Sequence, residues 1–323
     1  MEREHKYFID YLRIAVCFMV VLIHIKANSF ITSIAVPIFF MISGYLFVEK
    51  VDTYSTNKRK FVLQRVERLL IPYFAISAVM IVLSILFEKF LPHLIDTQEF
   101  QTISLSLILN KLFVEGVSGQ LYFLISLFFV YIFLIPTYSW LKNKYFSLFF
   151  FLLYIVSQPY LRQVYVNIPL VGDTLILNAP DVGIKFFLFG AVIHHFEDKI
   201  KPLFEKQGFS IFLVLILVMS IIYHKGVIIF SLILIIAFLA LAYFLGKNYK
   251  STKIRFISGL TYGIYLFHLP YFVKLSELLF SPLNSHHPVL ILAKALIIFF
   301  SSAIFVMLLR KNALSKKLFL GEK

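Results

Sequence analysis

The chain is a series of apolar runs separated by short segments that contain charged residues, proline or asparagine. Such runs predict transmembrane helices, because a helix needs roughly 20 apolar residues to cross a bilayer. The pattern therefore predicts an all-α, polytopic transmembrane helical bundle of about ten spans, with residues 1–323 forming one domain. The expected spans are residues 11–25, 34–48, 70–88, 121–140, 146–158, 182–196, 209–224, 227–245, 256–273 and 289–309.

One further stretch, residues 102–114, is apolar but short, and Asn110 and Lys111 interrupt it. A segment of this length does not reach across the hydrocarbon core. We interpret it as an interfacial or re-entrant helix and leave it out of the span count.

Lysine and arginine are distributed unevenly between the two sets of loops that this topology creates. Cytoplasmic loops carry the positive excess in membrane proteins, and most of the 31 Lys and Arg residues fall in the two tails and in alternate loops. We therefore expect both termini in the cytoplasm and a multi-pass protein of the plasma membrane, with the lipid bilayer as a partner. This orientation also accounts for the net charge of +14.

Composition removes several other classes of protein. Hydrophobic residues make up 60% of the chain and charged residues 15%, which excludes a water-soluble domain. No basic module with interleaved aromatic residues is present, so no nucleic-acid partner is expected. The single cysteine, Cys17, excludes disulfides and a thiolate cluster. The adjacent His286 and His287 give only a weak metal signal, and we expect no metal.

The first span contains two ionisable residues, Arg13 and His24. Ionisable groups inside a membrane are costly and are functional candidates by default. Eleven residues of helix return to nearly the same face and separate the two by roughly 16 Å, which suits a long substrate along that face. Arg13 either snorkels to lipid phosphate or binds a substrate phosphate. His24 is either a hydrogen-bonded structural residue or a general base.

Two more groups of polar residues stand out. Arg65 and Arg68 lie one helical turn apart behind Lys60, either as a positive-inside flank or as a site for an anionic cytoplasmic cofactor. Tyr262, Tyr265 and His268 share one expected span; tyrosines often belong to interfacial belts, but two of them with a histidine inside one span favour the lining of a polar cavity.

Taken together, these pieces resemble the acyltransferase 3 family of integral membrane acyltransferases. The matching segments occur in the family's order over residues 7–310, with Tyr122 where the family usually has Trp. They are Asp10–Arg13 (DYLR) with His24, Pro37–Leu46 (PIFFMISGYL) with Ser43, Lys60–Pro72 with its RxxR, Gln120–Leu124 (QLYFL), Phe187–Gly190 (FLFG) and Tyr262–His268 (YGIYLFH).

The resemblance implies transfer of an acyl group, often acetyl, from cytoplasmic acyl-CoA to a hydroxyl of a surface glycan or lipid-linked sugar. It implies that His24 is the catalytic base. We expect the donor to bind Arg13, Lys60, Arg65 and Arg68, and the acceptor to bind Ser43, Tyr122, Tyr265 and His268. The enzyme would complete the transfer itself or pass the acyl group to a separate extracytoplasmic partner.

Two rival interpretations make different predictions. A transporter or exporter of a glycan or lipid intermediate would use its buried cations to line a pathway, and would show internal inverted symmetry, which the sequence lacks. A sensor or scaffold without catalysis would keep its function when both His24 and His268 are changed.

Overall fold

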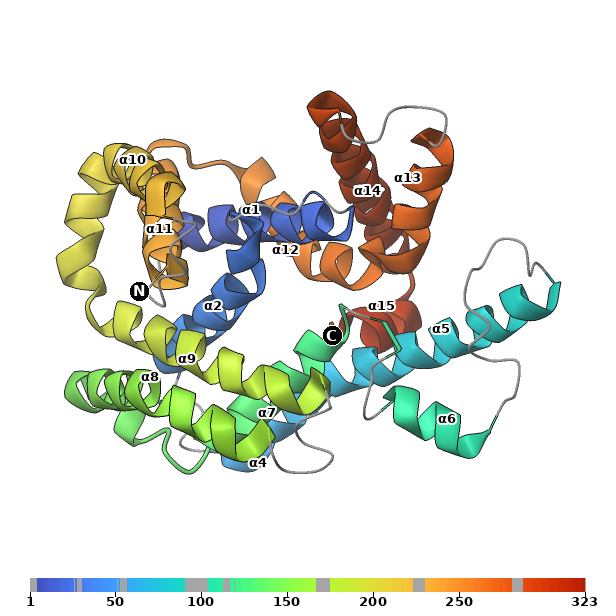
Figure 1. The fold of residues 1–323 in the computed structure, drawn as a ribbon, viewed down its shortest axis with the longest axis horizontal. Helices are drawn as coiled ribbons and strands as arrows, with labels where there is room; N and C mark the ends of the chain where they lie inside the picture. Colours follow the sequence, from blue (N-terminus) through green and yellow to red (C-terminus); the bar gives the residue numbers. More distant parts are fainter. Residues whose placement is uncertain are drawn as a thin grey trace. The chain divides into compact units, whose positions relative to one another are not determined.

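The computed structural model describes residues 5–25, 27, 31–50, 52, 57–90, 104–112, 117–118, 120–166, 175–222, 230–280 and 287–322. Within these residues the regular structure is entirely helical, with no strand (Figure 1). The all-α prediction is therefore confirmed for this part of the chain.

Each expected span overlaps a helix, and seven helical segments of the described chain are long and apolar enough to cross a membrane. Two shorter apolar helices cover Tyr122–Leu134 and Gly183–His195. The polytopic helical bundle is thus confirmed, whereas the count of ten and the cytoplasmic termini stay predictions. The α-helices are α1 (Tyr7–His24), α2 (Ala35–Glu49), α4 (Lys58–Arg65), α5 (Ile71–Phe90), α6 (Leu105–Asn110), α7 (Tyr122–Leu134), α8 (Lys144–Val166), α9 (Leu175–His195), α10 (Glu197–Ile222), α11 (Phe230–Asn248), α12 (Thr252–Phe267), α13 (Val273–Phe280), α14 (Pro288–Leu309) and α15 (Ala313–Leu320).

Short turns of tighter or wider helix join some of these elements. The 3₁₀ turns are η1 (Thr32–Ile34) and η5 (Trp140–Lys142), and the π-helical turns are η2 (Val66–Leu70) and η7 (His268–Phe272). Both π-helical turns contain or adjoin residues that the sequence selected as functional, and such turns are frequent at functional sites.

The stretch at 102–114 is described over residues 104–112, where it forms the six-residue helix α6. Ser104 caps this helix, its side-chain oxygen accepting a hydrogen bond from the backbone N–H of Leu107 at 3.1 Å. Six residues of helix span only about 9 Å. The described segment is therefore too short to cross a membrane, as predicted, and its interfacial or re-entrant placement stays a prediction.

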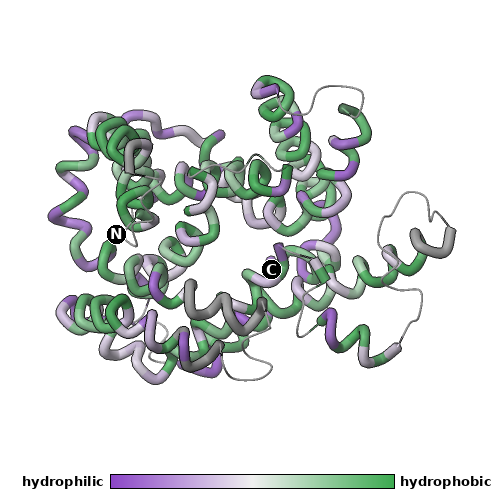
Figure 2. The backbone as a smooth tube through the Cα atoms, in the orientation of Figure 1, coloured by the Kyte–Doolittle hydropathy of each residue, from purple (hydrophilic) through white to green (hydrophobic). Residues whose placement is uncertain are grey.

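Several long helices expose large apolar side chains. Leu217 of α10 is 64% exposed and Phe300 of α14 is 59% exposed. Figure 2 shows hydrophobic residues over much of the length of the long helices. Large apolar side chains that lie exposed on such helices are typical of a bilayer environment, so these exposed faces fit contact with lipid.

The contacts divide the chain into two compact units, each described here by itself. The first comprises Met1–Val51, Trp140–Phe151 and Phe186–Leu308, and the second comprises Asp52–Ser139, Leu152–Lys185 and Leu309–Lys323. This division does not test the expected single domain, which stays a prediction.

The first unit is built around α1, which packs against α2, α11 and α12, while α10 pairs with α11 (Figure 1). Two glycines allow α2 and the end of α9 to approach closely. A Cβ on Gly44 would lie 1.9 Å from the carbonyl oxygen of Phe187, and one on Gly190 would lie 2.0 Å from that of Met41. Small residues at such crossings let membrane helices pack backbone to backbone. The glycines of two sequence motifs therefore meet at one helix crossing.

In the second unit, η2 joins α4 to α5 and contacts α7, and α15 packs on α5. The helix α15 ends at Gly321, whose left-handed conformation (φ +58°) is a common helix cap. A Cβ on Gly321 would lie 2.7 Å from the carbonyl oxygen of Glu67 and 2.8 Å from Cα of Arg68. The final helical turn thus lies directly against η2.

Candidate active site

Two predicted site residues, Arg13 and His24, belong to the single unbroken helix α1. Both side chains are half-buried, and His24 is the last residue of the helix. Because α1 is unbroken, Arg13 and His24 lie on nearly the same face of one helix, roughly 16 Å apart along its axis. The end of α1 therefore presents an imidazole that is neither fully buried nor fully in solvent.

His268 lies at the point where α12 ends. Proline has no N–H group, and it disfavours helical backbone at the residue before it. Pro270 follows Leu269, which has φ −109° and ψ 153°, far from helical values. The expected span over 256–273 lies within Thr252–Phe280, a segment long and apolar enough to cross a membrane, but Pro270 breaks the regular helix inside it, so α12 ends at Phe267 and η7 begins at His268.

The hydrogen bond of His268 defines which ring nitrogen can act on another molecule. Its Nδ1 lies 2.8 Å from the backbone carbonyl oxygen of Tyr265. A carbonyl oxygen only accepts, so Nδ1 carries the proton and Nε2 of the neutral ring is an acceptor. His268 is fully buried, and Nε2 has no hydrogen-bond partner among the described residues. A buried unsatisfied acceptor costs about 1–3 kcal/mol, and a catalytic or ligand-binding role is one explanation for such an atom, beside strain or a bound water.

His24 and His268 form a pair of rings whose centroids lie 5.0 Å apart. Residues beside both histidines pack into one apolar cluster around Val21, Val273, Ala295 and Ile298. Polar groups beside such a cluster interact more strongly than in water, because the local dielectric constant is low. The two helix ends therefore place a pair of imidazoles beside an apolar wall.

Tyr265 and Ser43 extend this site toward α2. The ring of Tyr265 lies 6.1 Å from that of His268 and 5.4 Å from that of Phe39. Ser43 donates a hydrogen bond to the carbonyl oxygen of Phe39 at 2.8 Å. The structure thus links His24, His268 and Tyr265 through successive ring contacts, whereas the hydrogen bond of Ser43 stays within its own helix, one turn from Phe39.

The remaining predicted residues lie in the second unit. The guanidinium of Arg65 lies 4.9 Å from the ring centre of Phe61 and 4.8 Å from that of Tyr131, within cation–π range. Arg68 is exposed within η2, and Tyr122 is half-buried at the start of α7. Lys60 is exposed on the first turn of α4, where Asn57 accepts a hydrogen bond from the Lys60 backbone N–H at 2.8 Å.

The family comparison decides what kind of protein carries these residues. The model of the acyltransferase domain of the acyltransferase 3 family matches residues 6–311, nearly the whole chain. The chain belongs to the acyltransferase 3 family. It is therefore a membrane acyltransferase, in agreement with its polytopic helical fold. No curated protein and no solved structure matches the chain in the corresponding comparisons.

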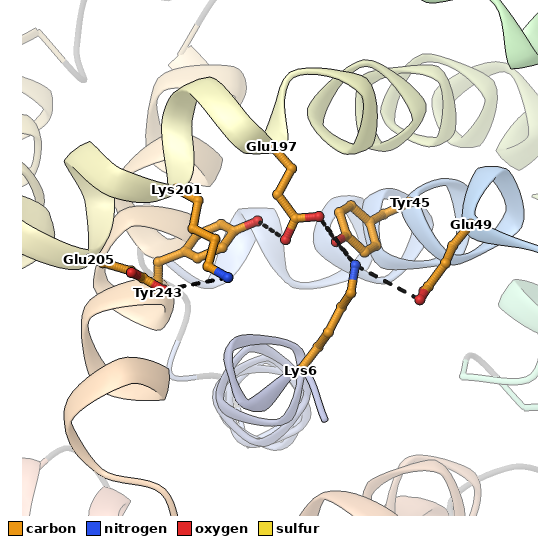
Figure 3. Close-up of polar contacts among 7 residues, drawn as sticks. All are labelled: Lys6, Tyr45, Glu49, Glu197, Lys201, Glu205 and Tyr243. Atoms are coloured by element: carbon orange, nitrogen blue, oxygen red, sulfur yellow. Dashed lines mark hydrogen bonds and ion pairs between the residues drawn. The ribbon is translucent and has the colours of Figure 1, made fainter. Parts of the chain in front are cut away.

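Sequence reasoning missed one polar group of this acyltransferase, which Figure 3 shows beside the start of α1. Lys6 lies 3.2 Å from Glu197, whose carboxylate also accepts hydrogen bonds from the hydroxyls of Tyr45 and Tyr243. The predicted orientation had placed Lys6 and Glu197 on the same side of the membrane. Contact between residues so far apart in sequence depends on the packing of α1, α2, α10 and α11, which no local spacing reveals.

Proposed function

We propose that this acyltransferase moves an acyl group, acetyl in the simplest case, from cytoplasmic acyl-CoA to a hydroxyl of a cell-surface glycan or lipid-linked sugar at the plasma membrane. The observation that supports it best is the pair of imidazoles at the ends of α1 and α12 in a member of this family. Hydroxyl acylation needs a base near the attacking oxygen, and imidazole serves this role near neutral pH.

In the proposed reaction, His24 removes the proton from the acceptor hydroxyl. The oxygen then attacks the carbonyl carbon of the thioester, and a carbon–oxygen bond forms. The carbon–sulfur bond breaks, the CoA thiolate leaves, and the proton held by His24 neutralises it. The products are an O-acyl ester and free CoA, so no further reactant is required.

His268 has the features of a group that holds the acceptor. Its Nδ1 is occupied by the Tyr265 carbonyl, so Nε2 can only accept a hydrogen bond. A sugar hydroxyl can supply that hydrogen. His268, Tyr265, Ser43 and Tyr122 are the residues that we propose to bind the acceptor. The hydrogen-bond donors among them are candidates for stabilising the oxyanion.

For the donor, we propose that the phosphates of acyl-CoA bind Lys60, Arg65 and Arg68, with Arg13 contacting the donor farther into the membrane. Guanidinium groups bind phosphate through paired hydrogen bonds. Packing of Gly321 against η2 supports this role, because it holds the backbone of Arg68 against the terminal turn.

The proposal is tested by CoA release from acetyl-CoA by purified protein in detergent, with a cell-surface glycan extract as acceptor. Wild-type protein should release CoA only when glycan is present, and His24→Ala should abolish this release. His287→Ala is the matched control, since His287 is exposed and its ring accepts a hydrogen bond from the Val289 N–H at 3.3 Å rather than contacting either imidazole. A fully active His24→Ala protein would overturn the assignment of the base.

A second arm tests the reaction itself. Folded wild-type protein that releases no CoA from acetyl, longer or charged acyl donors would contradict acyl-CoA-dependent transfer. Transport of a labelled lipid-linked sugar by the same preparation in vesicles would then favour the exporter interpretation.

A further inference from the structure

A polar cavity of about 330 Å³ lies beside the start of α1 in the first unit. Its walls come from the residues that enter α1, the first turns of α10 and the last turns of α11. Four lysines line it, Lys6, Lys201, Lys247 and Lys250, but only two glutamates, Glu197 and Glu205. The lining therefore has an excess of positive charge, and none of its residues belongs to the proposed acyl-transfer site.

Glu197 is already occupied by protein groups. Its Oε2 accepts hydrogen bonds from the Tyr45 hydroxyl at 2.5 Å and from Lys6 at 3.2 Å, and its Oε1 accepts one from the Tyr243 hydroxyl at 3.1 Å (Figure 3). A carboxylate with three donors has little capacity left for a ligand. Glu197 therefore acts as an anchor that positions Lys6 and the two tyrosines.

Glu205 is set back behind two lysines. It lies 3.9 Å from Lys201 and 3.3 Å from Lys247, and its side chain is only 20% exposed. The two lysine side chains are 44% and 55% exposed. Each ammonium has three N–H donors, so the group that meets solvent is cationic while the carboxylate lies beneath it.

Tight packing forms the wall of the cavity on the α1 side. A Cβ on Gly246 would lie 2.7 Å from the backbone nitrogen of Phe8, so only glycine allows α11 to come this close. The ring of Phe8 stacks on Tyr243 at a centroid distance of 4.0 Å. His5, which also lines the cavity, lies 2.5 Å from the carboxylate of Asp10. The cavity is thus bounded by residues fixed through their own contacts.

We propose that this cavity binds a phosphate group of an anionic ligand, with Lys201 and Lys247 as the main contacts. Ammonium groups form strong charge-assisted hydrogen bonds with phosphate oxygens. Basic pockets between transmembrane helices bind phospholipid head groups when they lie on the cytoplasmic side, which is where the predicted orientation places this one. Either an anionic phospholipid or a soluble nucleotide carries the required group.

The test measures binding to purified full-length protein with two probes. Phosphatidylglycerol is compared with phosphatidylcholine by native mass spectrometry, and adenosine 3′,5′-bisphosphate is measured by calorimetry. The test variant is the double substitution Lys201→Gln with Lys247→Gln. The matched control is Lys253→Gln with Lys311→Gln, which removes the same charge at two exposed lysines outside the cavity lining.

We expect one probe to bind wild-type and control protein, and the test variant to bind it roughly thirtyfold more weakly. Selective loss of phosphatidylglycerol binding identifies a lipid head group, and loss of bisphosphate binding identifies a soluble ligand. If neither probe binds wild-type protein, or if both double variants bind equally, the proposal is overturned. Adenosine 3′,5′-bisphosphate is also the nucleotide part of CoA, so bisphosphate binding that Lys201→Gln with Lys247→Gln leaves intact belongs to the proposed donor site, and only the binding lost in this variant reports on the cavity. Phosphatidylglycerol binding does not involve the acyl donor and is independent of the proposed function.

A third variant tests the sign of the charge effect. Glu205→Gln removes the recessed negative charge and leaves all four lysines, so it should tighten binding of the same probe severalfold. Unchanged or weaker binding would contradict an anion site. Elution as a single species in size-exclusion chromatography establishes that each variant is folded before binding is measured.

Discussion

The two ends of α1 carry very different polar groups, although they belong to one helix of 18 residues. At its start, Lys6 and Glu197 are saturated with partners from α2 and α11. At its end, His24 stands beside a buried His268 whose Nε2 has none among the described residues. Satisfied polar networks make a structure rigid, whereas unsatisfied buried groups cost stability and are retained where they serve a function. The contacts of Lys6 and Glu197 at the first end therefore hold helices together, whereas the unpaired Nε2 at the second end fits the substrate-binding role that we propose for it.

The largest expected effect is a loss of activity without a loss of stability, at the His24 end of α1. Replacing His24 with Ala should lower the rate of acyl transfer at least 100-fold, since general acid–base catalysis contributes roughly 10²–10⁴. The melting temperature should change little, because His24 is half-buried at a helix end. CoA release and thermal unfolding in the same detergent measure both quantities. A melting temperature that falls together with activity would indicate a structural histidine instead.

The next prediction uses the unsatisfied Nε2. His268→Phe keeps a planar ring in the buried site but removes the acceptor. Transfer should fall about tenfold or more, the loss expected for one hydrogen bond to substrate. Stability should change little, because the variant no longer buries an unpaired Nε2 but also loses the Nδ1 hydrogen bond to the Tyr265 carbonyl. A variant that is both less stable and fully active would show that His268 serves packing alone.

The helix α2 contributes to both ends, since Tyr45 contacts Glu197 and Phe39 contacts Tyr265. Gly44→Ala should therefore lower the melting temperature and activity together, because its Cβ would lie 1.9 Å from the Phe187 carbonyl oxygen. Overpacking of this kind costs about 1–3 kcal/mol.

The matched control for that substitution is Gly259→Ala in α12, where an added Cβ meets nothing within 4 Å. A helical Gly-to-Ala change without a clash stabilises by about 0.5–1 kcal/mol. Equal melting temperatures for the two alanine variants would contradict the close crossing of α2 and α9.

The sequence predicted features that depend on the periodic pattern or on neighbouring residues, and it did not predict contacts between segments that are distant in sequence. Apolar runs located the helices, and the helical repeat placed Arg13 and His24 on one helix, both of which the structure confirms. The predicted span across Pro270 is present, but hydropathy did not predict the break in regular helix at Leu269, because it does not register a missing backbone N–H group. The contact of Lys6 with Glu197 and the proximity of His24 to His268 depend on tertiary packing, which periodicity does not encode. Gly44 and Gly190 also depend on tertiary packing, because each is needed only where the backbone of another helix comes close to it.

The smallest predicted effect concerns the start of α1 and requires a double-mutant cycle. Lys6→Gln and Glu197→Gln each remove one partner of a pair whose side chains are 28% and 17% exposed. Each single variant should lower the unfolding free energy by about 1–3 kcal/mol, because the remaining group loses its nearest oppositely charged partner, while Lys6 keeps Glu49 at 3.8 Å and Glu197 keeps its two tyrosine donors. The double variant should lose less than the sum, with a coupling energy of about 1 kcal/mol. Unfolding in a titration with a denaturing detergent measures all four proteins. Additive losses would mean that the two residues act separately, and the contrast between the two ends of α1 would then rest on the histidines alone.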